Sequence, residues 1–398
     1  MKILLTHRFF WPDTAPYALM LRAIGDALAE AGHEINVLSS MPSYRANAKA
    51  DTPPRQESLG ALNVKRIWVF CDEKRNPLRR LSNVVVYSWA LFVNILRQRP
   101  DLVSASTFPP VIAAWSASLA ARLIRARFVY HVQDIHPEVS QLSGGALGRG
   151  LPMRLLRWLD NQTLRRSDAI VVLSEDMANS LRARGLDPLP IHIINNLSLD
   201  TAGGEAIAPP TELRKPEGNR RVIFAGNLGR FQQLPLLADG VSRLFDTYPD
   251  LELFFLGDGT ALRELEERWE GHAQVSFAGF LPFDQAKVLI EEADIGLVSL
   301  LPGVYRVAYP SKVLSYAGLG LPMLALVEPE SELAKSLRQG GVGAVPDAHT
   351  PEAIAAALKE LLESHITPDT VQAWHETFAG RTQILSSWRA LVQGLKRR

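Results

Sequence analysis

The sequence has 398 residues, more than one hydrophobic core usually organises, so it predicts two domains of about 150 to 200 residues. Its 47% hydrophobic and 21% charged residues exclude a disordered chain, and no basic segment interleaved with aromatic residues points to nucleic-acid binding. Cys71 is the single cysteine, which excludes an intramolecular disulfide and a cysteine-type zinc site and predicts a reducing, cytoplasmic setting.

The first half of the chain alternates short apolar runs with helical stretches. The N-terminal run is too short before His7 and Arg8 to predict a signal peptide, and we interpret it as the first strand. Runs that are apolar on both faces and separated by helices predict a parallel sheet covered on both sides. The predicted strands are KILLTH, EINVLSS, VKRIWVF, DLVSAS, RFVYHVQD, AIVVLS and IHIINN.

A basic, apolar region lies within this half. From Lys74 to Arg127 there are nine basic residues and one acid, and they flank an apolar helix predicted over 81–96 that carries Tyr87 and Trp89. The helix is shorter than the roughly 20 residues needed to span a bilayer. Two interpretations stay open: a face held against anionic lipid headgroups, or a buried helix with solvated arginines at its ends.

The alternation restarts after a segment rich in Gly, Pro and charge at 200–219, which we expect to be an exposed linker. We therefore expect an N-terminal domain over 1–199 and a second doubly wound domain over 220–382, with a final helix at about 383–398 returning to the first. Such domains bind ligands at the carboxyl ends of their strands. The second set of strands is RRVIFAGNLG, LELFFLGDG, QVSFAGF, IGLVSL, LPMLALVE and VGAVP.

Three segments of the second domain could bind phosphate. In the first, FAGNLGR at 224–230, glycines let backbone N–H groups approach a phosphate and Arg230 adds charge, although an ordinary βα turn would look similar. LGDG at 256–259 repeats the pattern at the same sheet edge. In the third, Pro310 opens a helix that carries the Ser311 hydroxyl and the Lys312 ammonium, groups suited to a diphosphate.

These motifs, in this order and with the later FAGFLP, ADIGL and GLP, resemble the donor domain of retaining family 4 glycosyltransferases of the GT-B fold. The resemblance covers essentially the whole chain. Pro-Ser-Lys at 310–312 and VQDIHPE at 132–138 are most similar to the branch that adds fucose or N-acetylfucosamine in bacterial O-antigen and capsule synthesis. It implies an α/β protein in which two Rossmann-like domains face each other across a cleft.

The resemblance also implies roles for individual residues. Arg230 and Lys312 would stabilise the leaving diphosphate, Phe280 and Leu281 would border the nucleobase, and Asp134 would lie at the reacting centre. The implied donor-binding residues are Gly226, Asn227, Gly229, Gly257, Phe280, Leu281, Pro310, Ser311, Ser315 and Tyr316. On the acceptor side and in the first βα loop, FWPDTAP at 10–16, they are Trp11, Pro12, Ala15, Gln133 and Glu138.

The chain departs from the family pattern at several positions. Two glutamates separated by seven residues, the second of which meets the ribose, are here Val307 and Ser315. The Arg/Lys pair of the first donor loop is replaced by Asn227 and Gln232. Gln133 stands where many members have a histidine, so the family's general base cannot be transferred to this chain.

No Asp-x-Asp triplet occurs, so we expect no essential metal and no cofactor beyond a nucleotide-sugar co-substrate, with UDP favoured over GDP. The acceptor would be a glycan or a polyprenyl-diphosphate-linked saccharide. Asp134 would orient its hydroxyl, unless this residue only caps the following helix. The alternatives are a non-catalytic nucleotide-sugar binding protein and a GT-B nucleotide-sugar epimerase. A dehydrogenase is disfavoured because no Gly-x-Gly-x-x-Gly follows the first strand.

Overall fold

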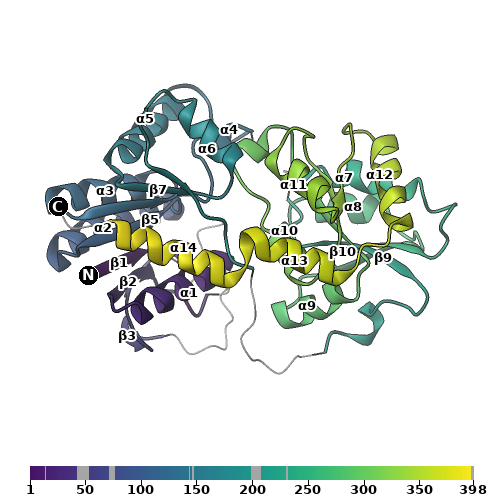
Figure 1. Ribbon diagram of the computed structural model, residues 1–398, viewed down its shortest axis with the longest axis horizontal. Coiled ribbons are helices and arrows are strands. Elements are labelled where there is room, and N and C mark those ends of the chain that lie inside the picture. The colour runs from purple at the N-terminus through teal and green to yellow at the C-terminus, as the bar shows by residue number, and fades with distance from the viewer. Residues whose placement is uncertain are drawn as a thin grey trace. The chain divides into compact units, whose positions relative to one another are not determined.

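The computed structural model describes residues 1–13, 15–42, 53–70, 77–142, 144–145, 148–198, 208–229 and 232–395. The chain forms two compact units (Figure 1). Unit 1 comprises Met1–Leu197, Val307–Tyr309 and Arg381–Arg398, and unit 2 comprises Ser198–Arg306 and Pro310–Gly380. The expected divisions at 199 and 382 lie within two residues of these limits, whereas the sequence did not predict that Val307–Tyr309 belongs to unit 1.

Unit 1 is built on a sheet whose described strands run in the order β3-β4-β2-β1-β5-β6-β7-β8. Every pairing is parallel except that of β3 with β4. The order reverses direction between β1 and β5, which makes the carboxyl ends of these two strands the expected ligand-binding edge. The strands are β1 Lys2–Thr6, β2 Glu34–Ser40, β3 Gln56–Leu59, β4 Leu62–Ile67, β5 Leu102–Ser106, β6 Arg127–His131, β7 Ala169–Val172 and β8 Ile191–Ile193.

Helices bury apolar residues on both faces of this sheet. On one face α2, α3, α5 and α6 cover a cluster that includes Tyr87, Phe128 and Met177. On the other, α1 and α14 cover a cluster that includes Met20 and Trp388. The helices of unit 1 are α1 Pro16–Glu30, α2 Pro77–Gln98, α3 Ile112–Leu123, α4 Glu138–Leu142, α5 Gly150–Arg166, α6 Glu175–Arg182 and α14 Arg381–Gly394.

The structure corrects the expected surface of the 81–96 helix, which forms part of α2. Tyr87 is buried in the core of unit 1, and its hydroxyl donates to the Leu38 carbonyl at 3.3 Å. Trp89 is exposed instead. None of the described helices is long and apolar enough to cross a membrane.

Unit 2 contains an all-parallel sheet with the described order β11-β10-β9-β12-β13-β14, which reverses direction between β9 and β12. Both sheets confirm the predicted α/β fold of doubly wound parallel sheets. The strands are β9 Arg220–Ala225, β10 Leu251–Leu256, β11 Val275–Gly279, β12 Ile295–Ser299, β13 Met323–Leu326 and β14 Gly343–Ala344. The helices are α7 Leu234–Ser242, α8 Leu262–Arg268, α9 Phe283–Glu291, α10 Lys312–Gly318, α11 Glu332–Gly340, α12 Pro351–Glu363 and α13 Pro368–Ala379.

Most of residues 208–219 in the expected linker are exposed, but the segment also contacts unit 2. The Lys215 ammonium binds both carboxylate oxygens of Asp294, at 2.9 and 3.0 Å. The guanidinium of Arg221 donates to the Leu213 carbonyl at 2.8 Å. A composition rich in Gly, Pro and charge favours this exposure but does not indicate which groups of the sheet the segment will contact. Residues 199–207 of the expected linker lie outside the described residues.

Candidate active site

The glycine turns of unit 2 interlock at the carboxyl ends of β9, β10 and β11. The Gly226 N–H donates to the Leu256 carbonyl at 2.7 Å, and the Gly257 N–H donates to the Gly279 carbonyl at 2.7 Å. A Cβ on Gly257 would lie 1.8 Å from the Gly226 oxygen, and its φ of +138° also favours glycine. The two motifs that the sequence singled out thus form one compact backbone platform beside the β9/β12 reversal.

Lys312 reaches this platform from α10, the helix that follows β12. Its Nζ would lie 3.3 Å from a Cβ on Gly226 and is 4.5 Å from the centroid of the Phe224 ring. The side chain is half-buried, and burial lowers the pKa of the ammonium to about 8. Lys312 makes no hydrogen bond or ion pair with any residue that the structure describes. Its charge therefore faces glycine backbone without a carboxylate partner.

The other expected donor-binding residues lie in the turn after β9 and at the start of α10, and they differ in exposure. Gly226, Asn227 and Ser311 are exposed. Gly229 is buried, and its N–H donates to the Gln232 side-chain oxygen at 2.8 Å, so this glutamine closes the turn. Pro310 and Ser315 are half-buried. Arg230, expected to carry charge here, lies outside the described residues.

Phe280 and Leu281, expected beside the nucleobase, directly follow β11 at the same edge of the sheet. The Phe280 side chain is 53% exposed, and Leu281 is half-buried. An exposed aromatic ring at a strand end can stack on a flat base.

Tyr316 is a correction to the expected donor-binding set. Its side chain is buried, and its hydroxyl accepts from the Ala225 N–H at 2.8 Å. The ring lies so close to β12 that a Cβ on Gly296 would be 2.6 Å from it. Tyr316 therefore fixes α10 against the ends of β9 and β12 and supports Lys312 from below. Helical spacing puts Tyr316 one turn after Lys312, on the same face of α10.

Sequence reasoning missed three residues at this edge. The Gln233 side-chain amide donates to the Leu300 carbonyl at 2.7 Å and meets His349 Nδ1 at 3.0 Å, which joins the loops after β9, β12 and β14. One Glu328 oxygen accepts from the Gly303 N–H, and its other oxygen is buried without a hydrogen-bond partner among the described residues. All follow strand ends, and that position was the available signal.

In unit 1, a chain of hydrogen bonds crosses the carboxyl ends of β1, β5 and β6. His7 Nδ1 lies 2.5 Å from the Ser106 hydroxyl, and the Tyr17 hydroxyl lies 2.9 Å from His131 Nδ1. Burial lowers the pKa of both histidines to about 3, so both are neutral at pH 7. Neither histidine is among the residues expected at the site, although His7 directly follows β1 and His131 ends β6.

Gln133 extends this chain. Its amide nitrogen is 2.7 Å from His131 Nε2, and it exchanges two hydrogen bonds with the Asn196 amide, at 2.7 and 3.1 Å. An amide nitrogen only donates, so His131 Nε2 accepts and its Nδ1 carries the proton toward Tyr17. Gln133 therefore orients its neighbours and is not itself a base.

Asp134 is held by its backbone beside these groups. Its N–H donates to the Thr107 hydroxyl at 3.4 Å, and it forms an isolated antiparallel bridge with Ala308. Burial raises the pKa of the half-buried carboxyl to about 6. The alternative role as a helix cap is wrong, because α4 begins at Glu138, four residues later.

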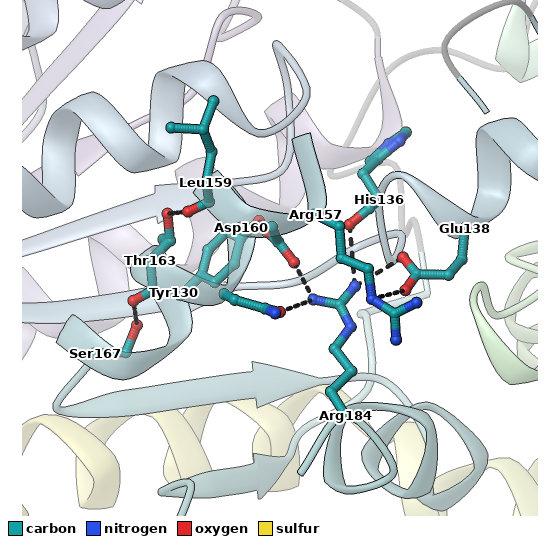
Figure 2. A network of polar contacts seen from close by, with 10 residues as sticks. Tyr130, His136, Glu138, Arg157, Leu159, Asp160, Thr163, Ser167 and Arg184 are labelled. Carbon is teal, nitrogen blue, oxygen red and sulfur yellow. Dashed lines mark hydrogen bonds and ion pairs between the residues drawn. The ribbon is translucent and has the colours of Figure 1, made fainter. Parts of the chain in front are cut away.

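Glu138 takes part in a structural ion network. Its carboxylate lies 2.7 Å from the Arg184 guanidinium and 3.7 Å from that of Arg157. Figure 2 shows the Arg184 guanidinium between Glu138 and Asp160, whose second oxygen accepts from the Tyr130 hydroxyl at 2.8 Å. An acceptor would therefore have to compete with two arginines for the Glu138 carboxylate. This carboxylate connects α4 to α5 and to the turn after α6.

The first loop of unit 1 is partly exposed. The Trp11 ring is 42% exposed, and Pro12 is exposed as well. Ala15 is a correction, because its side chain is buried against Phe9 and Ala18 where α1 begins. A small residue fits that position because Pro16 starts the helix directly over the core. Within the described residues, no group of three or more His, Cys, Asp or Glu side chains could hold a metal ion.

Comparison with known families assigns both halves of the chain. Residues 17–196 match a glycosyl transferase 4-like domain, and residues 219–364 match the glycosyl transferases group 1 domain. A protein of Escherichia coli (strain K12) named as the colanic acid biosynthesis glycosyl transferase WcaI is 24% identical over 387 residues, which cover 92% of this chain and 94% of that protein. WbjE of Pseudomonas aeruginosa, named as a glycosyltransferase, is 24% identical over 274 residues, or 67% of each chain.

Solved structures share the fold over the full length. Sucrose-phosphate synthase from Thermosynechococcus elongatus aligns with a TM-score of 0.73 at 12% identity, covering 99% of this chain and 98% of that one. HepE from Anabaena, solved in complex with UDP, aligns with a TM-score of 0.67 at 16% identity, covering 99% and 100%. The chain is therefore a glycosyltransferase of the GT-B fold, in which a glycosyl transferase 4-like domain precedes a group 1 domain.

Proposed function

We propose that this glycosyltransferase transfers a sugar from a UDP-sugar, with retention of anomeric configuration and without an essential metal ion, to a glycan or polyprenyl-diphosphate-linked acceptor in cell-surface polysaccharide synthesis. The observation that carries the proposal is the Lys312 ammonium, which lies against the Gly226 turn at the reversal point of the unit 2 sheet without a carboxylate partner among the described residues.

The chemistry of the leaving group supports this role for Lys312. Negative charge builds on the diphosphate as the glycosidic bond breaks, and fixed cations and N–H groups in a partly desolvated site stabilise it without reorganisation. A half-buried ammonium that has no counter-ion among the described residues gains most from such a ligand, because binding neutralises a charge that burial disfavours.

The relatives support the substrate classes. The printed name of WcaI refers to colanic acid biosynthesis, and HepE has been solved with UDP and with UDP-glucose. The sugar itself is proposed only as far as the fucose or N-acetylfucosamine branch that the motifs at 132–138 and 310–312 resemble. On the acceptor side, the proton would pass to the departing phosphate while Asp134 orients the attacking hydroxyl.

Thermal unfolding with UDP tests the donor site directly. A ligand at 100 times its dissociation constant adds about 2.7 kcal/mol to the unfolding free energy, which shifts the melting temperature measurably. We expect the shift with wild type and its loss in Lys312→Ala. Lys287→Ala is the matched control, because Lys287 is a partly exposed lysine of α9 in the same unit and is paired with Glu291. An equal shift in both variants would exclude the proposed role of Lys312.

Transfer assays separate the finer points. Donor turnover that persists after treatment with EDTA supports a metal-independent reaction, and the anomeric configuration of the product, read by NMR, tests retention. UDP binding without any transfer or hydrolysis would favour the non-catalytic alternative, and release of an epimerised UDP-sugar would favour the epimerase.

A further inference from the structure

Two helices of unit 1 present apolar side chains to solvent in regular stripes. On α2 the stripe is Leu81, Val85 and Trp89, and the Trp89 ring is 66% exposed. On α5 it is Leu151, Leu155 and Trp158, with Leu151 77% exposed. Spacings of three and four residues put each set on one face of its helix. Isolated exposed leucines are ordinary, but two ordered stripes that each end in tryptophan are not.

The two stripes belong to one layer. Helix α3 packs against both α2 and α5, and the three helices cover the same face of the unit 1 sheet. Each follows a strand of the parallel part of that sheet and runs antiparallel to it, so each begins at the carboxyl edge of the strands. Leu81, Leu151 and Leu155 lie in the first two turns of their helices, and therefore toward the edge that carries Asp134.

The charge on this layer has a single sign. The three helices contain eight arginines and one acid, Asp160. Asp160 is buried, forms an ion pair with Arg184 and accepts a hydrogen bond from the Tyr130 hydroxyl, so it contributes no negative charge to the surface. The exposed arginines of the layer are Arg79, Arg80, Arg97, Arg122, Arg154, Arg157 and Arg165.

The inner side of α5 is fixed, which keeps its outer stripe pointing outward. Figure 2 shows Asp160 of α5 joined through Arg184 to Glu138 of α4, and Thr163 of the same helix bonded to Leu159 and Ser167. The helix cannot rotate to bury Trp158 without breaking a buried ion network, which is a costly change.

We propose that the α2–α3–α5 layer docks unit 1 onto an anionic lipid bilayer, with Trp89 and Trp158 inserted at the interface and the arginines on the headgroups. Exposed apolar stripes flanked by arginines, beside a Glu138 carboxylate that Arg157 and Arg184 already hold, are complementary to such a surface rather than to an acidic protein alone. Only the role of this docking rests on the proposed function: docking brings the edge that carries Asp134 to the membrane, where a lipid-linked acceptor resides.

Co-sedimentation of the full chain with vesicles tests this surface. We expect wild type to sediment at least about tenfold better with phosphatidylcholine vesicles that contain phosphatidylglycerol than with phosphatidylcholine alone, and to be released as salt rises from 0.1 M to 1 M, where the Debye length falls from about 10 Å to about 3 Å. Equal sedimentation with both lipids, or none with either, would overturn the proposal.

Variants assign the binding to the two helices. Trp89→Asp combined with Trp158→Asp should lower binding about tenfold or more, and Arg80→Gln and Arg154→Gln about fivefold each. The matched controls are Phe283→Asp and Arg263→Gln, exposed residues of unit 2 that should leave binding unchanged. Unchanged binding of the double tryptophan variant would refute docking through this layer.

The same samples separate this inference from the proposed function. The UDP-dependent thermal shift should be equal in wild type and in the three docking variants, because none of the changed residues lies in unit 2. A wild type that binds vesicles but not UDP would refute the donor function and leave the docking surface standing. Loss of the thermal shift in the double tryptophan variant alone would reveal damaged folding of that variant, and the binding of Arg80→Gln and Arg154→Gln to vesicles would then decide whether this layer docks.

Discussion

The partly buried ammonium of Lys312 lowers the stability of the folded state, because burial disfavours its charged form. Burial lowers the pKa of its ammonium to about 8, so between that pH and the ordinary value near 10.5 the unfolded chain binds more protons than the folded one. Stability must therefore rise with pH across that window, and below about pH 8 the charged side chain opposes folding by its full amount.

We predict that Lys312→Met stabilises the unliganded protein at pH 7, by about 1 to 3 kcal/mol, because it removes a desolvated charge while keeping most of the apolar stem. The same variant should lose the thermal shift with UDP. Chemical denaturation at pH 7 and pH 10 measures the gain in stability, which should fall to about 1 kcal/mol or less at the higher pH. A variant less stable than wild type at pH 7 would show that the ammonium has a stabilising partner.

Asp134 carries a second titration that can be observed. With its pKa raised to about 6 by burial, the carboxylate is protonated in mildly acidic solution. We predict that kcat/KM for transfer falls tenfold per pH unit below about 6, and that Asp134→Asn is slow and flat over the same range. An acid limb that survives in the asparagine variant would assign the titration to another group.

At the scale of single elements, the glycine platform depends on close backbone approach. Gly257 and Gly271 both have positive φ, so alanine strains both positions, but only Gly257 also faces the Gly226 oxygen. We predict that Gly257→Ala lowers the unfolding free energy by at least about 2 kcal/mol more than Gly271→Ala and abolishes the UDP shift. Paired urea titrations measure the difference. Equal losses of unfolding free energy in the two variants would mean that the close contact between Gly257 and the Gly226 oxygen does not constrain the platform.

The part of the candidate site that could be predicted from the sequence is also clearest for single elements. Strand ends marked by glycine and a helix that opens with Pro-Ser-Lys located Gly226, Gly257 and Lys312, because backbone chemistry at a sheet edge is local. Tyr316 and Ala15 were placed wrongly, since local pattern does not tell which side of a helix start meets the core. The partners of Lys215 and Glu138 are 79 and 46 residues away, so only the folded chain reveals them.

At the scale of the whole molecule, each unit has its own hydrophobic core, and the proposed UDP site belongs to unit 2. The interior of unit 1 depends on α14, whose Trp388 is buried and lies 4.9 Å from the His131 ring. UDP, by contrast, should contact the platform of unit 2. Perturbations of the two units should therefore be separable by calorimetry.

We predict that Trp388→Ala costs unit 1 about 3 to 5 kcal/mol while the transition stabilised by UDP changes little. Scanning calorimetry with and without UDP would show one transition that the substitution lowers and another that the nucleotide raises. A single transition that both changes move together would show that the units unfold as one cooperative body.

The interleaving of the two units along the chain limits how the molecule can be divided. Unit 1 is assembled from three stretches, because Val307–Tyr309 and α14 return to it after most of unit 2 has been made. A gene cut after Leu197 would encode a fragment without the bridge at Asp134 and without Trp388. In synthesis of the full chain, the core of unit 1 can close only after the codons for α14 have been translated. Genetic fusion or exchange of the halves therefore has to carry both returning stretches with the first.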